Sequence, residues 1–150
     1  GLWALGKGKY NVRVSDIGGT CTITLSGGNM PPSKFPFRIK RIPSPVAYIA
    51  NSQGGAIGNG TFRVQRGIEP RLENFDFNAR CEIQGFMLRY IARREDPVIV
   101  TNPGGSFNGQ SAALISKAKP GDTYVFDNVK ARCPGDPVGR NINSLSFNIK

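Results

Sequence analysis

The chain has 150 residues, with 20 Lys and Arg against 10 Asp and Glu and no His, so its net charge is +10. This length suits one domain, or one domain with part of another, and 39% hydrophobic residues suffice for a packed core. The longest apolar run, residues 46–50, is far shorter than the about 20 residues of a membrane-spanning helix. There is no N-terminal signal segment, and a start at Gly1 without Met is typical of a fragment of a longer protein.

The absence of His makes catalytic and metal sites difficult to build. Serine and cysteine nucleophiles usually need a neighbouring base, most often His, and zinc sites usually use His or clustered Cys. Cys21, Cys81 and Cys133 lie far apart and form no C-x-x-C pair. They are compatible with buried unpaired thiols or with one disulfide and one free thiol, and their spacing does not choose between these. We therefore expect no enzyme activity, no catalytic residue, no cofactor and no metal ion.

Two acidic clusters are the remaining candidates for catalysis. One contains Glu69, Glu73 and Asp76, and the other contains Glu95 and Asp96. Paired carboxylates can hydrolyse glycosides when they are held about 5–10 Å apart. Because arginines are interleaved with both clusters, we interpret the acids as members of surface ion pairs.

The first strands are predicted by alternation of apolar and polar side chains. Residues 10–14 and 20–25 alternate at period two, and the Asp-Ile-Gly-Gly sequence at 16–19 predicts a turn between them. We therefore expect these strands to form a hairpin. Residues 27–32, Gly-Gly-Asn-Met-Pro-Pro, are typical of a linker, because glycine loosens the chain and proline ends a helix or a ladder.

A cationic strand is expected after this linker. In residues 35–40, apolar side chains alternate with Pro36, Arg38 and Lys40, which gives one apolar and one basic face. Pro36 has no N–H, so the strand should lie at a sheet edge or begin with a bulge. The next segments predict a short buried strand, a turn-rich loop and a further strand, at residues 46–49, 51–60 and 61–65.

The second half of the chain predicts long strands and one helix. In residues 80–94 the alternation changes phase at Gly85, and a second phase change falls at residues 127–128, which predicts two β-bulges. Residues 111–119 have apolar side chains at helical spacing and are followed by Pro-Gly, which predicts a helix, and a strand is the alternative because the segment is short. Residues 142–149 predict a closing strand. We therefore predict a mainly β fold, with immunoglobulin-like or β-sandwich strands and at most one short helix, at about 111–119.

Basic charge is concentrated in residues 31–70, where six Lys and Arg face one Glu. Such a patch can attract nucleic acid, an anionic membrane surface or an acidic protein face, or it can be a solvated strand face. The aromatic side chains of the 35–40 strand alternate away from the basic ones, whereas a nucleic-acid site would present them as stacking platforms. We therefore do not expect a nucleic-acid partner, and a cationic nucleic-acid binder is an alternative that a steep dependence of single-strand affinity on salt would favour.

Several segments together resemble a known family. Residues 37–47 (FRIKRIPSPVA) and 72–77 (LENFDF) resemble, in the same order, motifs of the C-terminal region of the GldM/PorM family. Residues 124–131 (YVFDNVKA) resemble that family's hydrophobic strand followed by D-N-[IV]-x-A. At residues 134–136 (PGD) the family commonly has G-P-D-G, and here Cys133 replaces the first glycine, which leaves the conformation of this turn open. Residues 9–25 resemble the end of a preceding immunoglobulin-like domain.

The resemblance implies a structural protein of the bacterial type IX secretion and gliding machinery. Such a shaft protein is anchored in the inner membrane by an N-terminal helix absent from this chain, and it forms a motor there with an integral membrane partner. It forms a homodimer, crosses the periplasm and contacts outer-membrane-associated ring proteins. This chain would be the distal end, which carries force and binds the ring and is not itself inserted in a membrane.

We therefore predict two parts, residues 1–28 as the C-terminal hairpin of a preceding immunoglobulin-like domain and residues 29–150 as a C-terminal β domain. Arg38, Lys40 and Arg41 form the candidate partner-binding patch, because a cationic strand face can dock on an acidic partner. The alternative function is a periplasmic or surface adhesion module that binds carbohydrate. Exposed aromatic side chains in a groove would favour that alternative.

Overall fold

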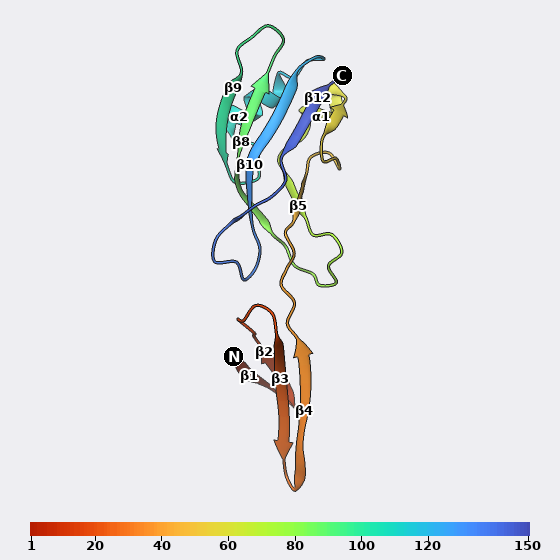
Figure 1. Ribbon diagram of the computed structural model, residues 1–150, viewed down its shortest axis with the longest axis vertical. Coiled ribbons are helices and arrows are strands. Elements are labelled where there is room, and N and C mark those ends of the chain that lie inside the picture. Colours follow the sequence, from red (N-terminus) through yellow and green to blue (C-terminus); the bar gives the residue numbers. More distant parts are fainter. The chain divides into compact units, whose positions relative to one another are not determined.

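The computed structural model describes all 150 residues, and its backbone separates into two compact units, Gly1–Arg41 and Ile42–Lys150 (Figure 1). We refer to them as unit 1 and unit 2. The predicted domain division into residues 1–28 and 29–150 stays a prediction, whereas the compact units divide between Arg41 and Ile42.

Unit 1 consists of two antiparallel hairpins. The first pairs β1 (Leu2–Gly6) with β2 (Lys9–Val12), and the second pairs β3 (Thr20–Gly27) with β4 (Met30–Arg38). The predicted hairpin between residues 10–14 and 20–25 is therefore wrong. So is the predicted linker at 27–32, because Gly27 pairs with Met30 across a two-residue Gly-Asn turn. The prolines of β4 are tolerated because β4 pairs with β3 alone and has a free edge.

The β3–β4 hairpin has one apolar and one polar face. Opposed residues share a face, so Cys21 with Phe37 and Ile23 with Phe35 form the apolar face, while Arg38 and the β3 threonines lie on the other. This confirms the predicted alternation in residues 35–38. No residue of unit 1 is fully buried, and Phe37 remains 54% exposed. Because a two-stranded hairpin is marginal in water, the apolar face needs a cover to be stable.

Unit 2 is built on one mixed sheet in which β12 and β6 are parallel and the other neighbours are antiparallel. The path across it is β6 (Gly55–Ile57), β12 (Leu145–Ile149), β10 (Thr123–Arg132), β8 (Glu82–Ile91) and β9 (Val98–Pro103), with β11 (Arg140–Asn141) paired to β10. A separate two-stranded ribbon joins β5 (Val46–Tyr48) to β7 (Glu69–Arg71).

Two short helices complete unit 2. The predicted helix at 111–119 is confirmed as α2 (Gly109–Ser116), which begins after Asn108, whose Oδ1 accepts the N–H of Ser111 at 3.0 Å. The strand predicted at 61–65 is wrong, because this region contains α1 (Asn59–Arg63). Five residues are too short to show a helical period, and the turn carries Phe62 into the core. Neither helix has the length and apolar content that spanning a bilayer requires.

The core lies on the face of the sheet that the helices cover. Phe62 of α1 packs on Tyr124 and Phe147, with ring centroids 4.7 and 5.8 Å apart. Phe126 lies between further rings, 5.6 Å from Phe86 and 5.9 Å from Phe107, and is fully buried. Each large apolar side chain buried in this way stabilises the fold by about 1.5–3 kcal/mol. The predicted mainly β class is confirmed, with one more short helix than expected.

Both predicted bulges are present, and they face each other across β8 and β10. Asp127 pairs with Met87 and Lys130 with Gly85, so β10 contains one extra residue. Ala131 then pairs with Ile83, so β8 contains the compensating extra residue and the register resumes. The two register shifts compensate each other, so β8 and β10, each ten residues long, remain paired on both sides of the bulges.

Candidate functional site

The three predicted partner-binding residues lie at the end of unit 1. Arg38 is the last residue of β4 and pairs opposite Thr20, on the polar face of the hairpin. Lys40 and Arg41 follow it, and all three side chains are exposed. Their part in binding stays a prediction, because exposure and charge alone do not identify a partner.

A disulfide links the two longest strands of unit 2. Cys81 immediately precedes β8, Cys133 immediately follows β10, and the bond between them closes a sequence separation of 52. Both cysteines are buried, whereas Cys21 of unit 1 is half-buried and is a free thiol. Of the two possibilities that the sequence left open, the structure therefore has one disulfide and one free cysteine.

The turn after the disulfide has a defined conformation. Asp136 N–H donates to the carbonyl of Cys133 at 3.0 Å, and Gly135 has a φ of +88°. A proline followed by a glycine with positive φ is the pattern of a type II turn. The replacement of glycine by Cys133, which left this turn open at the sequence level, is therefore compatible with a tight turn that carries Asp136 inward.

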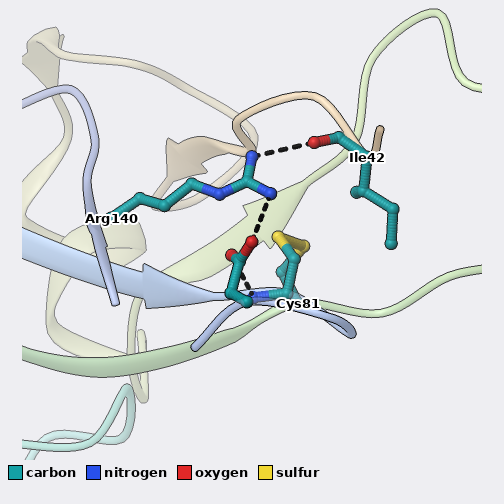
Figure 2. The surroundings of a disulfide bond; sticks show 5 residues. Ile42, Cys81 and Arg140 are labelled. Carbon is teal, nitrogen blue, oxygen red and sulfur yellow. Dashed lines mark hydrogen bonds and ion pairs between the residues drawn. A yellow bond between two sulfur atoms is a disulfide. The ribbon is translucent and has the colours of Figure 1, made fainter. Parts of the chain in front are cut away.

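Asp136 forms a buried ion pair with Arg140, and this pair holds the start of unit 2 (Figure 2). The Arg140 Nη2 atom lies 2.6 Å from Asp136 Oδ1, and the two side chains are only 13% and 5% exposed. Asp136 Oδ2 also accepts the N–H of Cys133 at 3.0 Å, while Arg140 Nη1 donates to the carbonyl of Ile42 at 2.8 Å. The ion pair thus joins residue 42 to the disulfide turn.

A second side chain holds the same stretch of backbone. Asn143 Oδ1 accepts the N–H of Ala47 at 2.8 Å, and Asn143 Nδ2 donates to the Ala47 carbonyl at 3.3 Å. We call Asp136, Arg140 and Asn143 the anchor, and residues 42–47 the entry segment. Because the anchor bonds both ends of the entry segment, this segment cannot leave unit 2 without breaking contacts at both points.

The sequence did not predict the anchor. Asp136 and Arg140 are four residues apart, a spacing that is informative on a helix but has no fixed meaning across a turn and a short strand. The only available signal was the turn sequence at 134–136. The energetic weight of such a pair comes from burial, since removing one partner of a buried ion pair costs about 3–5 kcal/mol.

The acidic clusters behave as surface ion pairs where the structure resolves their contacts. Arg71 Nη2 lies 2.7 Å from Glu69 Oε2, and this hydrogen bond lowers the pKa of Glu69. The carboxylate of Glu73 accepts a hydrogen bond from the hydroxyl of Tyr48, and this hydrogen bond raises the pKa of Tyr48. The surface ion-pair interpretation is confirmed for Glu69. No group of three or more Cys, Asp and Glu side chains is arranged to hold a metal ion.

Two buried tyrosines have raised pKa values for structural reasons. Burial and the hydrogen bond from Tyr90 Oη to Asp122 Oδ2, at 3.0 Å, raise the pKa of Tyr90 to about 12. Burial likewise raises the pKa of Tyr124, whose hydroxyl donates to the carbonyl of Leu114 at 2.6 Å. Asp122 also accepts the N–H of Lys119, so these groups fasten the end of α2 to the sheet.

The family comparison gives the decisive observation. Residues 43–150 match the model of the GldM C-terminal domain. The chain belongs to this family. No curated protein matches the chain. The resemblance found in the sequence is therefore confirmed for the part that forms unit 2. The GldM family is periplasmic and supplies structural components of gliding and type IX secretion.

Three of the GldM motifs found in the sequence can be located in unit 2. The segment 72–77 follows β7, and its Phe75 and Phe77 rings meet edge to face at 5.5 Å. The Asp-Asn pair at 127–128 contains the extra residue of the β10 bulge. Asp136 of the Pro-Gly-Asp turn is the buried acid of the anchor. Two of these motifs therefore lie at a bulge and at a turn of the GldM domain.

Proposed function

We propose that this chain is a structural and force-transmitting component of the type IX secretion and gliding motor, located in the periplasm. Its C-terminal domain would dock on the outer-membrane-associated ring. The parent protein would be held in the inner membrane by an N-terminal helix, next to an integral membrane motor partner. The observation that carries this proposal is the match of residues 43–150 to the GldM C-terminal domain.

The anchor supports a role in carrying load. A pull on residue 42 reaches Arg140 through the Ile42 carbonyl, then Asp136, and then the backbone of Cys133. The disulfide passes it on to Cys81 and β8, which pairs with both β9 and β10. Force entering unit 2 therefore reaches the centre of the sheet through short, buried contacts.

The disulfide also supports a periplasmic location. Structural disulfides form and persist in oxidising compartments such as the periplasm and are rare in the cytosol. Cys81 and Cys133 are buried at the ends of paired strands, which suits a permanent structural bond. This reasoning is independent of the family match.

We propose that Arg38, Lys40 and Arg41 contact the ring and that the chain acts as a homodimer. The charge of +10 supports docking on an acidic surface, because long-range attraction speeds association and selects oppositely charged partners. In the dimer, each copy would bring one such patch to the ring.

The test is capture of ring proteins by the purified chain, together with its mass by light scattering. Changing Arg38, Lys40 and Arg41 to Glu should abolish capture at low salt. The matched control changes Lys7, Lys9 and Arg13 to Glu, which alters the net charge equally and should leave capture intact. Unchanged capture by the first variant would remove the patch from the interface, and a monomeric mass would contradict the homodimer.

We propose that residues 1–28, as predicted from the sequence, belong to a larger immunoglobulin-like domain, and that β4, which pairs with β3, continues it to the end of unit 1. The support is the apolar face of β3–β4, on which Phe35 and Phe37 are 47% and 54% exposed. In a longer version of the protein, the amides of β3 and β4 should exchange with deuterium more slowly than they do in this chain. Equal exchange rates would contradict a covering domain.

A further inference from the structure

We propose that a notch in the uncovered face of the unit 2 sheet binds an acidic peptide segment of a protein partner. The notch has a volume of about 710 Å³ and a mixed lining, in which Gln84, Asn128, Lys130 and Asn141 are polar and Phe86, Met87 and Pro103 are apolar. Its lining residues belong mainly to β8, β9 and β10. Figure 1 shows that β8 runs between the other two strands. This inference deepens the proposed function and rests on it only for the partner being a protein.

The notch is formed by a missing side chain in a row across four strands. Gly85 of β8 is opposed by Pro103 of β9 on one side and by Lys130 of β10 on the other, and Lys130 is opposed by Asn141 of β11. Opposed residues in an antiparallel sheet point to the same face. Since neighbouring strands are about 4.8 Å apart, the gap at Gly85 leaves about 10 Å between the strands that carry Pro103 and Lys130.

The two bulges place amide side chains at the ends of this gap. Asn128 and Gln84 lie in the bulged stretches of β10 and β8, and both side chains are exposed. With Asn141 of β11, they surround the gap with three primary amides. Bulges often redirect side chains next to functional sites, and here both bulges serve the same small area.

The backbone beneath the notch is rigid. Gly104 N–H donates to the Gln84 carbonyl at 2.8 Å, and the fully buried Asn102 side chain donates to the carbonyls of Pro103 and Ser106 at 2.9 Å. A Cβ atom on Gly85 would lie 3.1 Å from the Asn102 carbonyl oxygen, so glycine suits this position best. A preformed site loses little conformational freedom on binding.

The charges in and beside the notch favour an acidic ligand. Lys130 has no carboxylate opposite it, because its partner on β8 is Gly85, and it forms no ion pair. The nearby Asp127 lies 3.3 Å from Arg89, so its charge is already compensated. A carboxylate would pair with the Lys130 ammonium, while the amides would pair with peptide N–H and carbonyl groups.

An acidic peptide fits this site better than a nucleic acid does. Binding to a phosphate backbone depends on several cations that neutralise successive phosphates, and the notch contains Lys130 as its one cationic side chain. The mixed donors and acceptors of three amides match the repeating groups of a peptide chain. The net charge of +10 would bring such a segment to the surface.

The test is an NMR titration of the full ¹⁵N-labelled chain with an oligoglutamate peptide, with oligoglutamine of equal length as the neutral control. Saturable shifts should centre on Gly85, Asn128 and Lys130 with oligoglutamate alone. Lys130→Glu should weaken binding about tenfold or more. The control Lys119→Glu makes the same charge change at an exposed residue outside the notch and should leave the affinity nearly unchanged.

Asn128→Gly provides a variant that keeps the fold. Asn128 has a φ of +50°, which glycine adopts readily, so this change removes the amide and leaves the bulge. It should weaken oligoglutamate binding without altering the remaining spectrum. The proposal is overturned if shifts centre on β4, if Lys130→Glu and Lys119→Glu weaken binding equally, or if no shift saturates.

Capture of ring proteins separates this proposal from the function it deepens. If oligoglutamate binds the notch but no ring protein is captured from cells, the notch stands and the proposed function fails. If the Lys130→Glu variant captures ring proteins as well as the unchanged chain does, the docking function stands and the notch is not its site.

Discussion

Units 1 and 2 contain the same kind of amphipathic strand in opposite surroundings. Phe37 of unit 1 and Phe126 of unit 2 both lie on the apolar face of a strand, yet Phe37 is 54% exposed and Phe126 is fully buried. The difference arises because the sheet of unit 2 has helices over its apolar face, whereas unit 1 contains no helix and its β3–β4 sheet has only two strands. The alternation of apolar and polar side chains therefore gives a strand an apolar face, but this face becomes part of a core only when a second layer of structure packs on it.

The largest effect should come from truncating the two phenylalanines. Phe126→Ala should lower the free energy of unfolding of unit 2 by about 3–5 kcal/mol, because it opens a cavity among aromatic rings. Phe37→Ala should change stability by less than about 0.5–1 kcal/mol, because little burial is lost. Urea unfolding followed by circular dichroism and by fluorescence of Trp3, the single tryptophan, reports on both units. Similar losses in the two variants would show that the hairpin is covered.

Breaking the anchor should have the next largest effect. Asp136→Ala leaves Arg140 buried without its carboxylate and should cost unit 2 about 3–5 kcal/mol. The control Asp127→Ala removes a more exposed partner of Arg89 and should cost about 1 kcal/mol or less. Combining Asp136→Ala with Arg140→Met should recover part of the loss. Pulling experiments should also find a lower unfolding force for Asp136→Ala, and an unchanged force would exclude the anchor from the load path.

Removing the disulfide should have a slightly smaller effect, confined to unit 2. The joint change of Cys81 and Cys133 to Ser should cost about 2–4 kcal/mol, mainly because the unfolded chain regains the freedom of a long loop. Thermal unfolding with and without reductant measures this loss. Cys21→Ser serves as the control and should behave like the unchanged chain, since Cys21 is outside the bond. Equal stability of the oxidised and reduced protein would contradict the prediction.

Alkaline pH should produce the smallest effect. The pKa of Tyr90 is about 12 in the folded protein against an ordinary value of 10.0, so the folded state retains this proton where the unfolded state loses it. The contribution of Tyr90 to the free energy of unfolding is therefore fully present below pH 10 and is lost as the pH rises from 10 toward 12. Denaturant midpoints across this range should decline less steeply for Tyr90→Phe. An identical decline would assign the loss to other groups.

The long strands of unit 2 could be predicted from the sequence because their side chains alternate at period two. The short strands β6, β7 and β11 were missed, and β6 lies inside the segment 51–60 that was predicted to be a loop. The phase changes at Gly85 and at residues 127–128 predicted two bulges, and the structure contains both. The helix at α1 could not be predicted, because its five residues show no period and its Phe62 is equally suited to a strand. Short elements take their conformation from the core that they cover.

Turn choice in unit 1 shows a second limit. Both the Asp-Ile-Gly-Gly sequence at 16–19 and the Gly-Asn pair at 28–29 can reverse a chain, and the sequence alone does not rank them. The structure forms its hairpin at the second of these, which pairs β3 with β4. The charges of Arg38, Lys40 and Arg41 identified them as candidates from the sequence. The anchor and the disulfide could not be predicted in this way, because they depend on contacts between residues far apart in the chain.

The place of β12 in the sheet has a consequence for how the protein is made. Residues 145–149 lie between β6 and β10, and their parallel partner, residues 55–57, is formed about ninety residues earlier in the chain. The sheet cannot close until this late segment has left the ribosome. A nascent GldM domain of this kind should therefore keep an incomplete sheet, with the edges of β6 and β10 unpaired, until the synthesis of residues 145–149 is finished.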